Sequence, residues 1–263
     1  MHHGHHKFIF VCGLHRSGTS VFFRCLASHP LVGGINKDGV FRYEGQHLQT
    51  VYQSDKAHGG PGKFGFHPEA HLTEDSPLVS EANRRRLLGD WQPYWDVRKP
   101  FLLEKSPPNL LKTRFLQAMF PESYFIMVIR HPIATSMATQ KWSHTSVRSL
   151  LQHWLVCHER FEADRAHLRR AFVVRYEAFV LEPKTVLDQV AQFLGLEPEF
   201  STAEVRSEAN EKYWAMWDAL RRRHWVSRWH LRAVARYFEQ KVNRFGYSFA
   251  GSNEQTNEHT KGG

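Results

Sequence analysis

A glycine-containing loop between an apolar strand and a helix constrains this chain more than any other feature. Residues 7–12 read KFIFVC, an apolar run typical of a buried strand. Residues 13–18 read GLHRSG, and residues 19–28 have the composition of a helix that ends at His29-Pro30. A loop in this position turns backbone N–H groups and the positive end of the helix dipole toward one point, so it predicts an anion site.

The spacing of Gly13 and Gly18 matches the G-x4-G of a nucleotide phosphate loop, but the following residue does not. A Walker A loop has lysine there, and this chain has Thr19. Arg16 is the one strong cation within the loop, and we find no convincing carboxylate motif for a magnesium ion. The structural alternative is a plain glycine turn with Arg16 in solvent.

Strands and helices alternate along the chain. Predicted strands cover residues 7–12, 101–104, 124–129 and 172–174, and predicted helices cover 19–28, 76–96 (from Ser76-Pro77), 109–120, 132–142, 149–169, 183–194 and a basic region ending near 245. This order predicts an α/β fold with a central parallel sheet flanked by helices on both faces, whose ligands bind at the carboxyl ends of the strands. Residues 31–77 have little periodicity and should carry functional loops. We expect one domain over residues 1–252 and a flexible tail over 253–263.

Three more polar residues occur at predicted strand ends. Lys105 follows one strand in the run EKSPPN, Arg130 ends the most apolar strand, and Tyr176 follows the last one. A lysine at such an end could neutralise charge that develops on a bridging oxygen. An ion-pairing arginine, an exposed lysine and a structural tyrosine are the plain alternatives.

Together these motifs resemble the sulfotransferase family. RSGTS, EKSP, the arginine of IRHP and the YE run occur in family order between Phe8 and Leu196, and residues 245–247 resemble the family's ending. The resemblance implies a P-loop NTPase-like sulfotransferase architecture, 3′-phosphoadenosine 5′-phosphosulfate as donor, and no metal. It assigns the 5′-phosphate and the transferring sulfuryl group to Arg16, Ser17, Gly18, Thr19 and Ser20. A P-loop kinase using ATP and magnesium, or a non-catalytic anion-binding module, remains the alternative.

The resemblance also assigns the other end of the nucleotide. Arg130 would bind the 3′-phosphate, and Tyr176 would contact the nucleotide. The family's usual serine, eight residues after this arginine, is Ala138 here. At about 100° per residue, Thr139 lies nearer the expected helix face than Ser136 does, so Thr139 is the substitute we expect.

Sulfuryl transfer to a hydroxyl or amine needs in-line attack and a base for the acceptor's proton. The family resemblance points to a glutamate after the first helix, and Glu44 is the first candidate, with Asp38 and His47 as alternatives. A helix-capping Glu44 is the structural alternative. Lys105 would stabilise charge on the leaving phosphate and the departing sulfuryl group. Pro107 occupies the position of the histidine base of the cytosolic small-phenol branch, so the chain resembles the carbohydrate- and tyrosine-directed branches more closely.

The 263 residues carry a net charge of +9, which favours anionic partners. No nucleic-acid reader module is recognised, so we expect no nucleic-acid partner. No apolar run reaches 18 residues, so no membrane span is expected. Cys12, Cys25 and Cys157 are too scattered for a disulfide framework or a zinc site, which indicates a reducing, cytoplasmic location, although a lumenal domain of a longer parent stays open. The acceptor (small molecule, carbohydrate or peptide) and the oligomeric state stay open.

Two further groups of side chains stand out in the sequence. The histidines of the glycine-rich region, His58, His67 and His71, are expected to shape the acceptor pocket, and His15 of the phosphate loop is expected to contact the acceptor. Arg228, Arg232 and Arg236 share one helix face. That face is either solvated or a lid for the nucleotide or an acidic acceptor.

Overall fold

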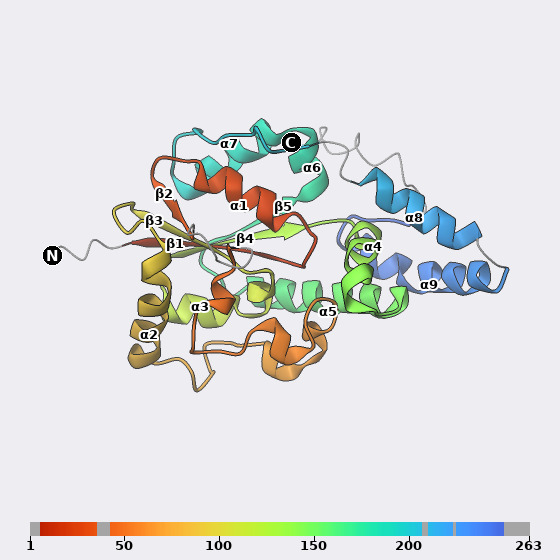
Figure 1. The fold of residues 1–263 in the computed structure, drawn as a ribbon, viewed down its shortest axis with the longest axis horizontal. Helices are drawn as coiled ribbons and strands as arrows, with labels where there is room; N and C mark the ends of the chain where they lie inside the picture. The colour runs from red at the N-terminus through yellow and green to blue at the C-terminus, as the bar shows by residue number, and fades with distance from the viewer. Residues whose placement is uncertain (1–5, 36–42, 207–209, 223–224, 250–263) are drawn as a thin grey trace.

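Five parallel strands form one sheet at the centre of the molecule (Figure 1). The computed structural model describes residues 6–35, 43–206, 210–222 and 225–249, with the backbone alone for 225–228. The strands are β1 (Lys7–Gly13), β2 (Val32–Gly34), β3 (Phe101–Lys105), β4 (Ser123–Ile129) and β5 (Ala171–Arg175), in the order β2-β3-β1-β4-β5. The α/β prediction is confirmed. The expected tail, residues 253–263, lies outside the described residues.

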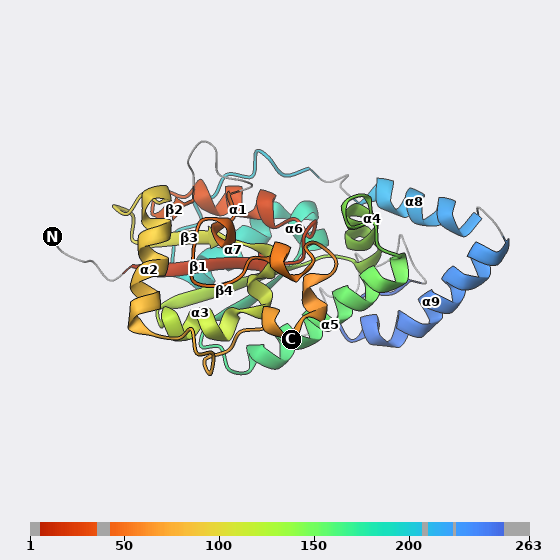
Figure 2. The ribbon, with the colours of Figure 1, turned by 60° about the horizontal axis from the view of Figure 1, so that its bottom comes forward.

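Helices cover both faces of the sheet, as predicted. They are α1 (Thr19–Ala27), α2 (Glu81–Trp91), α3 (Thr113–Met119), α4 (Pro132–Ser143), α5 (Val147–Arg165), α6 (Tyr176–Leu181), α7 (Pro183–Leu194), α8 (Glu211–Arg222) and α9 (Trp225–Asn243). Figure 1 shows α1, α6 and α7 above the sheet and α2, α3 and α5 below it. In Figure 2, α8 and α9 extend past the carboxyl end of the sheet beside α4 and α5. Within the described residues, no helix has the length and apolar character needed to cross a bilayer.

The central strands are apolar along their whole length because helices cover both of their faces. Every residue of β4 is buried, and β1 is buried from Phe8 onward. On one side of β1, Phe10 packs against Trp91 and Phe120, at ring-centroid distances of 6.1 and 5.9 Å. The indole N–H of Trp91 also donates to the carbonyl of Gly45 at 2.9 Å, so this core side chain connects α2 to the loop beside β3.

Three local predictions were wrong. Strand β2 was missed because it has only three residues, VGG, and exists through its pairing with β3. Helix α2 begins at Glu81 rather than near Ser76, since Ser80 accepts the helix-capping hydrogen bond from the Asn83 N–H. The helix predicted at 109–120 is divided into a 3₁₀ turn, η7 (Pro107–Leu111), and α3.

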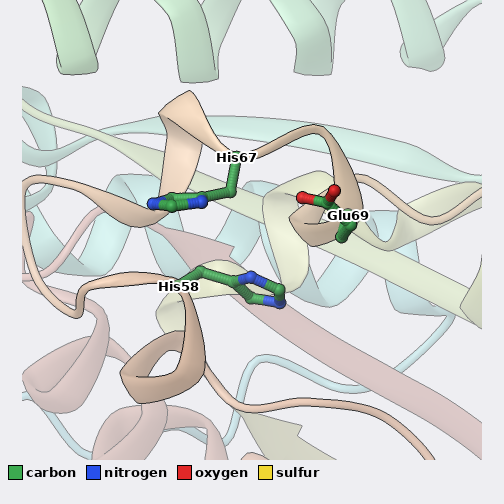
Figure 3. A group of neighbouring side chains, drawn as sticks. All are labelled: His58, His67 and Glu69. Carbon is green, nitrogen blue, oxygen red and sulfur yellow. The ribbon is translucent and has the colours of Figure 1, made fainter.

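The loop-rich region after β2 folds into short 3₁₀ turns: η2 (Gly45–His47), η3 (Asp55–His58), η4 (Phe64–Phe66) and η5 (Pro68–Ala70). It packs on α5, where the Gly65 N–H donates to His153 Nε2 at 3.0 Å. A Cβ at Gly65 would lie 2.2 Å from the Cys157 sulfur, so only glycine fits. The rings of His58 and His67 lie beside each other, with centroids 5.8 Å apart (Figure 3).

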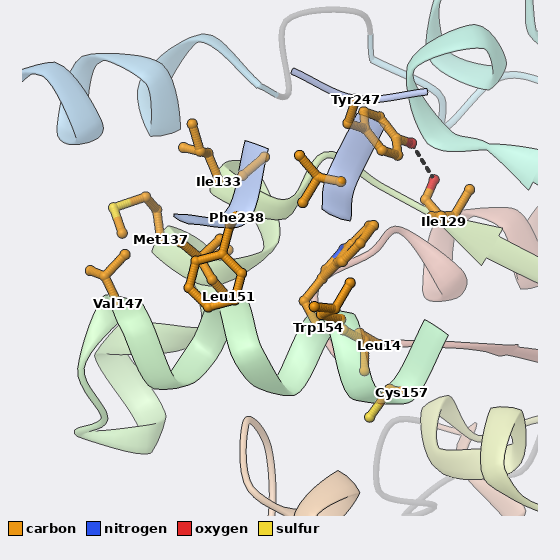
Figure 4. Packing of buried hydrophobic residues seen from close by; sticks show 14 of the residues in the cluster. Leu14, Ile129, Ile133, Met137, Val147, Leu151, Trp154, Cys157, Phe238 and Tyr247 are labelled. Carbon is orange, nitrogen blue, oxygen red and sulfur yellow. Dashed lines mark hydrogen bonds between the residues drawn. The ribbon is translucent and has the colours of Figure 1, made fainter. Parts of the chain in front are cut away.

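The C-terminal helices belong to the same core. Phe238 of α9 packs among side chains of α4 and α5, including Met137 and Leu151 (Figure 4). Beyond α9, the Tyr247 hydroxyl lies 3.4 Å from the carbonyl oxygen of Ile129, at the end of β4. The last described residues therefore return to the carboxyl edge of the sheet.

Replacing Trp91 by alanine should destabilise the fold by about 3–5 kcal/mol, because it removes a fully buried ring and leaves the Gly45 carbonyl without its donor. Trp229, whose side chain is 68% exposed, is the matched control, and Trp229→Ala should change the free energy of unfolding by less than about 0.5 kcal/mol. Urea denaturation of both variants measures the difference. Equal effects would refute this account of the core.

Candidate anion-binding and group-transfer site

The loop between β1 and α1 has the tight conformation that its glycines permit. Gly13 and Gly18 have φ values of 156° and 99°. A Cβ at Gly13 would lie 2.6 Å from the Val128 carbonyl oxygen, and one at Gly18 would lie 2.2 Å from the ring of Tyr176. Within the described part of the chain, the buried Ser17 hydroxyl has no hydrogen-bond partner. A buried donor of this kind is costly unless a ligand satisfies it.

Arg16 itself is left-handed, with φ of 70°, and its side chain is exposed. Its guanidinium lies 5.0 Å from the centroid of the Trp142 ring and hydrogen-bonds to Tyr213. Burial raises the pKa of the Tyr213 hydroxyl, but the hydrogen bond and positive charge of Arg16 outweigh burial and lower it. Arg16 is therefore exposed, but aromatic neighbours orient its guanidinium.

Arg130 lies directly against this loop. Its Nη1 donates to the Arg16 carbonyl at 2.8 Å, and its guanidinium stacks 4.2 Å from the centroid of the Tyr176 ring. Asn210, just before α8, accepts from Nε at 2.8 Å. Arg130 is 5% exposed, and burial lowers its pKa. The carboxyl ends of β1, β4 and β5 thus bring Arg16, Arg130 and Tyr176 together.

Glu177, at the start of α6, fixes this arrangement. One carboxylate oxygen accepts from the Asn210 side chain at 3.1 Å and from the His131 N–H at 3.0 Å. The other accepts from the Tyr247 hydroxyl at 3.0 Å. Sequence reasoning assigned no role to Asn210, Tyr213 or Tyr247. Only Tyr247 carried a signal, the FGY run at the family-like ending.

Glu44 and Lys105 form a buried ion pair. The Lys105 ammonium lies 3.2 Å from Glu44 Oε1, and the two residues are 1% and 2% exposed. Gln46 donates to the other carboxylate oxygen at 2.8 Å, and His47 Nε2 lies 3.7 Å from it. Glu44 makes no capping hydrogen bond to the turn that follows, so the capping alternative is wrong. Asp38 lies outside the described residues.

Glu104 holds the loop that carries Glu44. One of its carboxylate oxygens accepts from the Gly45 N–H at 2.8 Å and from the Ser106 hydroxyl at 2.5 Å. The other accepts from the Asn109 amide. Burial raises the pKa of the Glu104 carboxyl to about 7, against the lowering effect of these hydrogen bonds. A carboxyl group at the end of β3 therefore acts as a scaffold.

The residues of α4 near the loop differ in placement. Thr139 donates to the His15 carbonyl at 3.5 Å, so it contacts the loop between β1 and α1. Ser136 is buried, and its hydroxyl has no partner among the described residues. Ala138 lies in the apolar cluster. His15 also pairs with Asp55 of η3, Nε2 to Oδ2, at 3.3 Å.

Comparison with known proteins identifies the same family and fold. The model described as "Sulfotransferase family" matches residues 9–201. The fold is similar to the sulfotransferase domain of the Synechococcus PCC 7002 olefin synthase (15% identity, TM-score 0.54, covering 94% of this chain and 98% of that one). It is also similar to sulfotransferase STF9 from Mycobacterium avium (14% identity, TM-score 0.54, covering 94% of this chain and 79% of that one). A third similar structure is the sulfotransferase domain from the curacin biosynthetic pathway (15% identity, TM-score 0.51, covering 92% of this chain and 98% of that one). Asn210, Tyr213 and Tyr247 lie C-terminal to the matched segment.

The raised pKa of Glu104 has a measurable consequence. Its ordinary value is 4.5, so between about pH 4.5 and 7 the folded state holds a proton that the unfolded state has lost. The contribution of Glu104 to the free energy of unfolding should therefore fall by about 3 kcal/mol as the pH rises through this window. Glu104→Gln removes the titration, and Asn109, whose amide oxygen has no partner within the described residues, can rotate to accept from the new amide.

The measurement is the wild-type minus Glu104→Gln difference in free energy of unfolding, by denaturant titration across this pH range. Buried histidines titrate in both proteins and cancel in the difference. A difference that does not change with pH would contradict the raised pKa.

Proposed function

The chain belongs to the sulfotransferase family, and from this premise we propose that it transfers a sulfuryl group from 3′-phosphoadenosine 5′-phosphosulfate to a hydroxyl or amine acceptor. One observation carries the proposal. The pair of Arg16 with Arg130 and the buried pair of Lys105 with Glu44 lie at the same edge of the sheet, beside the loop between β1 and α1. We further propose that the acceptor is a small molecule, a carbohydrate or a peptide, and that the transfer uses no metal.

The phosphate loop would bind the 5′-phosphosulfate. Its backbone N–H groups and the first turn of α1 offer donors to an anion. The side chains proposed to assist are Arg16, Ser17, Thr19 and Ser20, with Gly18 allowing close approach. The partnerless Ser17 hydroxyl supports this assignment, since an incoming oxygen would supply its missing partner.

Arg130 would bind the 3′-phosphate. A guanidinium forms charge-assisted, often bidentate hydrogen bonds to phosphate, and the fixed orientation of Arg130 between Tyr176 and Asn210 lowers the entropy cost of forming them. We propose Tyr176 as a nucleotide contact and Thr139, through its position beside His15, as the replacement for the family's serine.

Glu44 and Lys105 would perform the transfer chemistry. The acceptor oxygen attacks sulfur in line, its proton passes to the Glu44 carboxylate, and the bond from sulfur to the bridging phosphate oxygen breaks. The electron pair stays on the leaving bisphosphate, where the Lys105 ammonium stabilises it. Their 3.2 Å contact supports this division of roles, because donor binding offers Lys105 a second anion and makes Glu44 available to the acceptor. His47 is the alternative base.

Two positions argue against the competing kinase function. Thr19 occupies the position of the Walker lysine, and donors already hold both carboxylate oxygens of Glu104 at the end of the neighbouring strand. A non-catalytic anion-binding module would keep nucleotide affinity but show no turnover.

Calorimetric titration tests the donor. Adenosine 3′,5′-bisphosphate should bind without added metal, and ATP with magnesium should not. Arg130→Ala should weaken the bisphosphate about 10–100-fold, while adenosine 5′-phosphate, which lacks the 3′-phosphate, should bind nearly as before. Arg169→Ala is the exposed-arginine control. An equal loss of affinity for both nucleotides would show that Arg130 does not bind the 3′-phosphate. Binding of ATP but not of the bisphosphate would favour the kinase function.

Glu44→Gln should lower kcat by roughly 10²–10⁴-fold because the acceptor loses its base, with nucleotide affinity nearly unchanged. Glu182→Gln, an exposed glutamate, is the control. Steady-state turnover with a sulfate-accepting test substrate, together with calorimetric nucleotide binding, separates the two effects. Normal turnover of Glu44→Gln combined with loss in His47→Asn would move the base to His47.

A further inference from the structure

Three potential metal ligands meet in the loop-rich region, apart from the residues assigned to transfer. His58 ends η3, His67 lies between η4 and η5, and Glu69 is in η5. Their ligand atoms all lie within 4.8 Å of one another, and Figure 3 shows both imidazole rings and the carboxylate around one common space. We propose that His58, His67 and Glu69 bind a divalent transition-metal ion, with Zn²⁺ as the best match.

The backbone that carries these ligands is held in place. Gly59 and Gly60 have positive φ values, and the Gly60 N–H donates to the Asp55 carbonyl at 2.8 Å, closing the turn after His58. Further on, the Gly65 carbonyl accepts from Arg160 at 3.0 Å. The segment between the ligands is thus anchored to α5, and a metal would have to order only side chains.

In the described ranges, no hydrogen bond or ion pair engages the side chain of His58, His67 or Glu69. Nearby His71, by contrast, pairs with Asp164 at 2.8 Å. Among the described residues, His71 has a carboxylate partner outside the cluster, whereas His58 and His67 have none. Side chains that bind a metal must be available to it, so histidines without another partner suit a metal site.

The chemistry of the donors selects the class of ion. Neutral imidazole coordinates a transition-metal ion through one of its ring nitrogens. Two imidazoles and one carboxylate suit Zn²⁺, whereas Mg²⁺ and Ca²⁺ prefer oxygen ligands. Tetrahedral Zn²⁺ needs ligand atoms about 3.3 Å apart, given metal–ligand bonds of about 2.0–2.1 Å. His67 and Glu69 are exposed and can rotate inward.

A metal ion bound by these residues would lie in the segment that contacts the loop between β1 and α1. Asp55, in the same turn as His58, pairs with His15 of the phosphate loop at 3.3 Å. A metal linking His58 to His67 and Glu69 would therefore stiffen the segment beside that loop, with a fourth position open to water. It takes no part in the proposed sulfuryl transfer, and the inference stands without that proposal.

The test uses the full chain with His2, His3, His5 and His6 replaced by alanine, because a histidine-rich segment would compete for the metal. Calorimetry with Zn²⁺ should give one tight equivalent, and Co²⁺ should give the visible absorption of a tetrahedral site. His67→Ala and Glu69→Gln, both at exposed positions, should each weaken Zn²⁺ binding. Loss of an outer-shell partner typically lowers metal affinity roughly 10–100-fold, and loss of a direct ligand should lower it by more. His167→Ala, an exposed histidine elsewhere, should change nothing, and Mg²⁺ should not bind.

Thermal melting confirms that each variant is folded, and Zn²⁺ should raise the melting temperature of the background protein but not of His67→Ala. Failure of the background protein to bind one equivalent of Zn²⁺ overturns the site. So does unchanged affinity in His67→Ala and Glu69→Gln, or an equal loss in His167→Ala.

Discussion

The site depends on holding two arginines together against their mutual repulsion. Arg130 donates to the main chain of Arg16. Burial, and to a smaller extent the positive charge of Arg16, oppose the charged form of Arg130, whereas Tyr176, Glu177 and Tyr213 favour it. The faces of Tyr176 and Tyr213 and the amide oxygen of Asn210 compensate for this cost. A cluster of positive charge fixed in this way before any ligand arrives favours an anion, because little reorganisation is left for the moment of binding.

The second constraint is a buried polar network at the end of β3. Glu104 positions the loop of Glu44 through hydrogen bonds, and Glu44 in turn pairs with Lys105. Such groups are expensive to bury, and they are tolerated where the remaining polar atoms are satisfied. In this protein the network holds the Glu44 carboxylate and the Lys105 ammonium beside the loop between β1 and α1 rather than in solvent.

The C-terminal segment completes the site from a distance. Asn210 and Tyr213 reach the two arginines from the start of α8, and Tyr247 reaches Glu177 after α9 has packed on α4 and α5. The arrangement of the two arginines and Glu177 thereby depends on the docking of helices outside the matched family segment. The loops between β2 and α2 support the opposite side, through the contact of Asp55 with His15.

By itself, the sequence determined the strand–loop–helix unit, the alternation that makes a parallel sheet, and the strand-end positions of Lys105, Arg130 and Tyr176. These features follow from local apolar patterns and glycine chemistry, and parallel strands necessarily collect their carboxyl ends at one edge. Only the tertiary structure decided the rest. Strand β2 forms only because it pairs with β3. The local sequence around each residue also does not reveal three other features: the ion pair of Glu44 with Lys105, the contacts of Asn210, and the grouping of His58 with His67. Contacts of that kind are set by packing over long sequence separations, which no local propensity encodes.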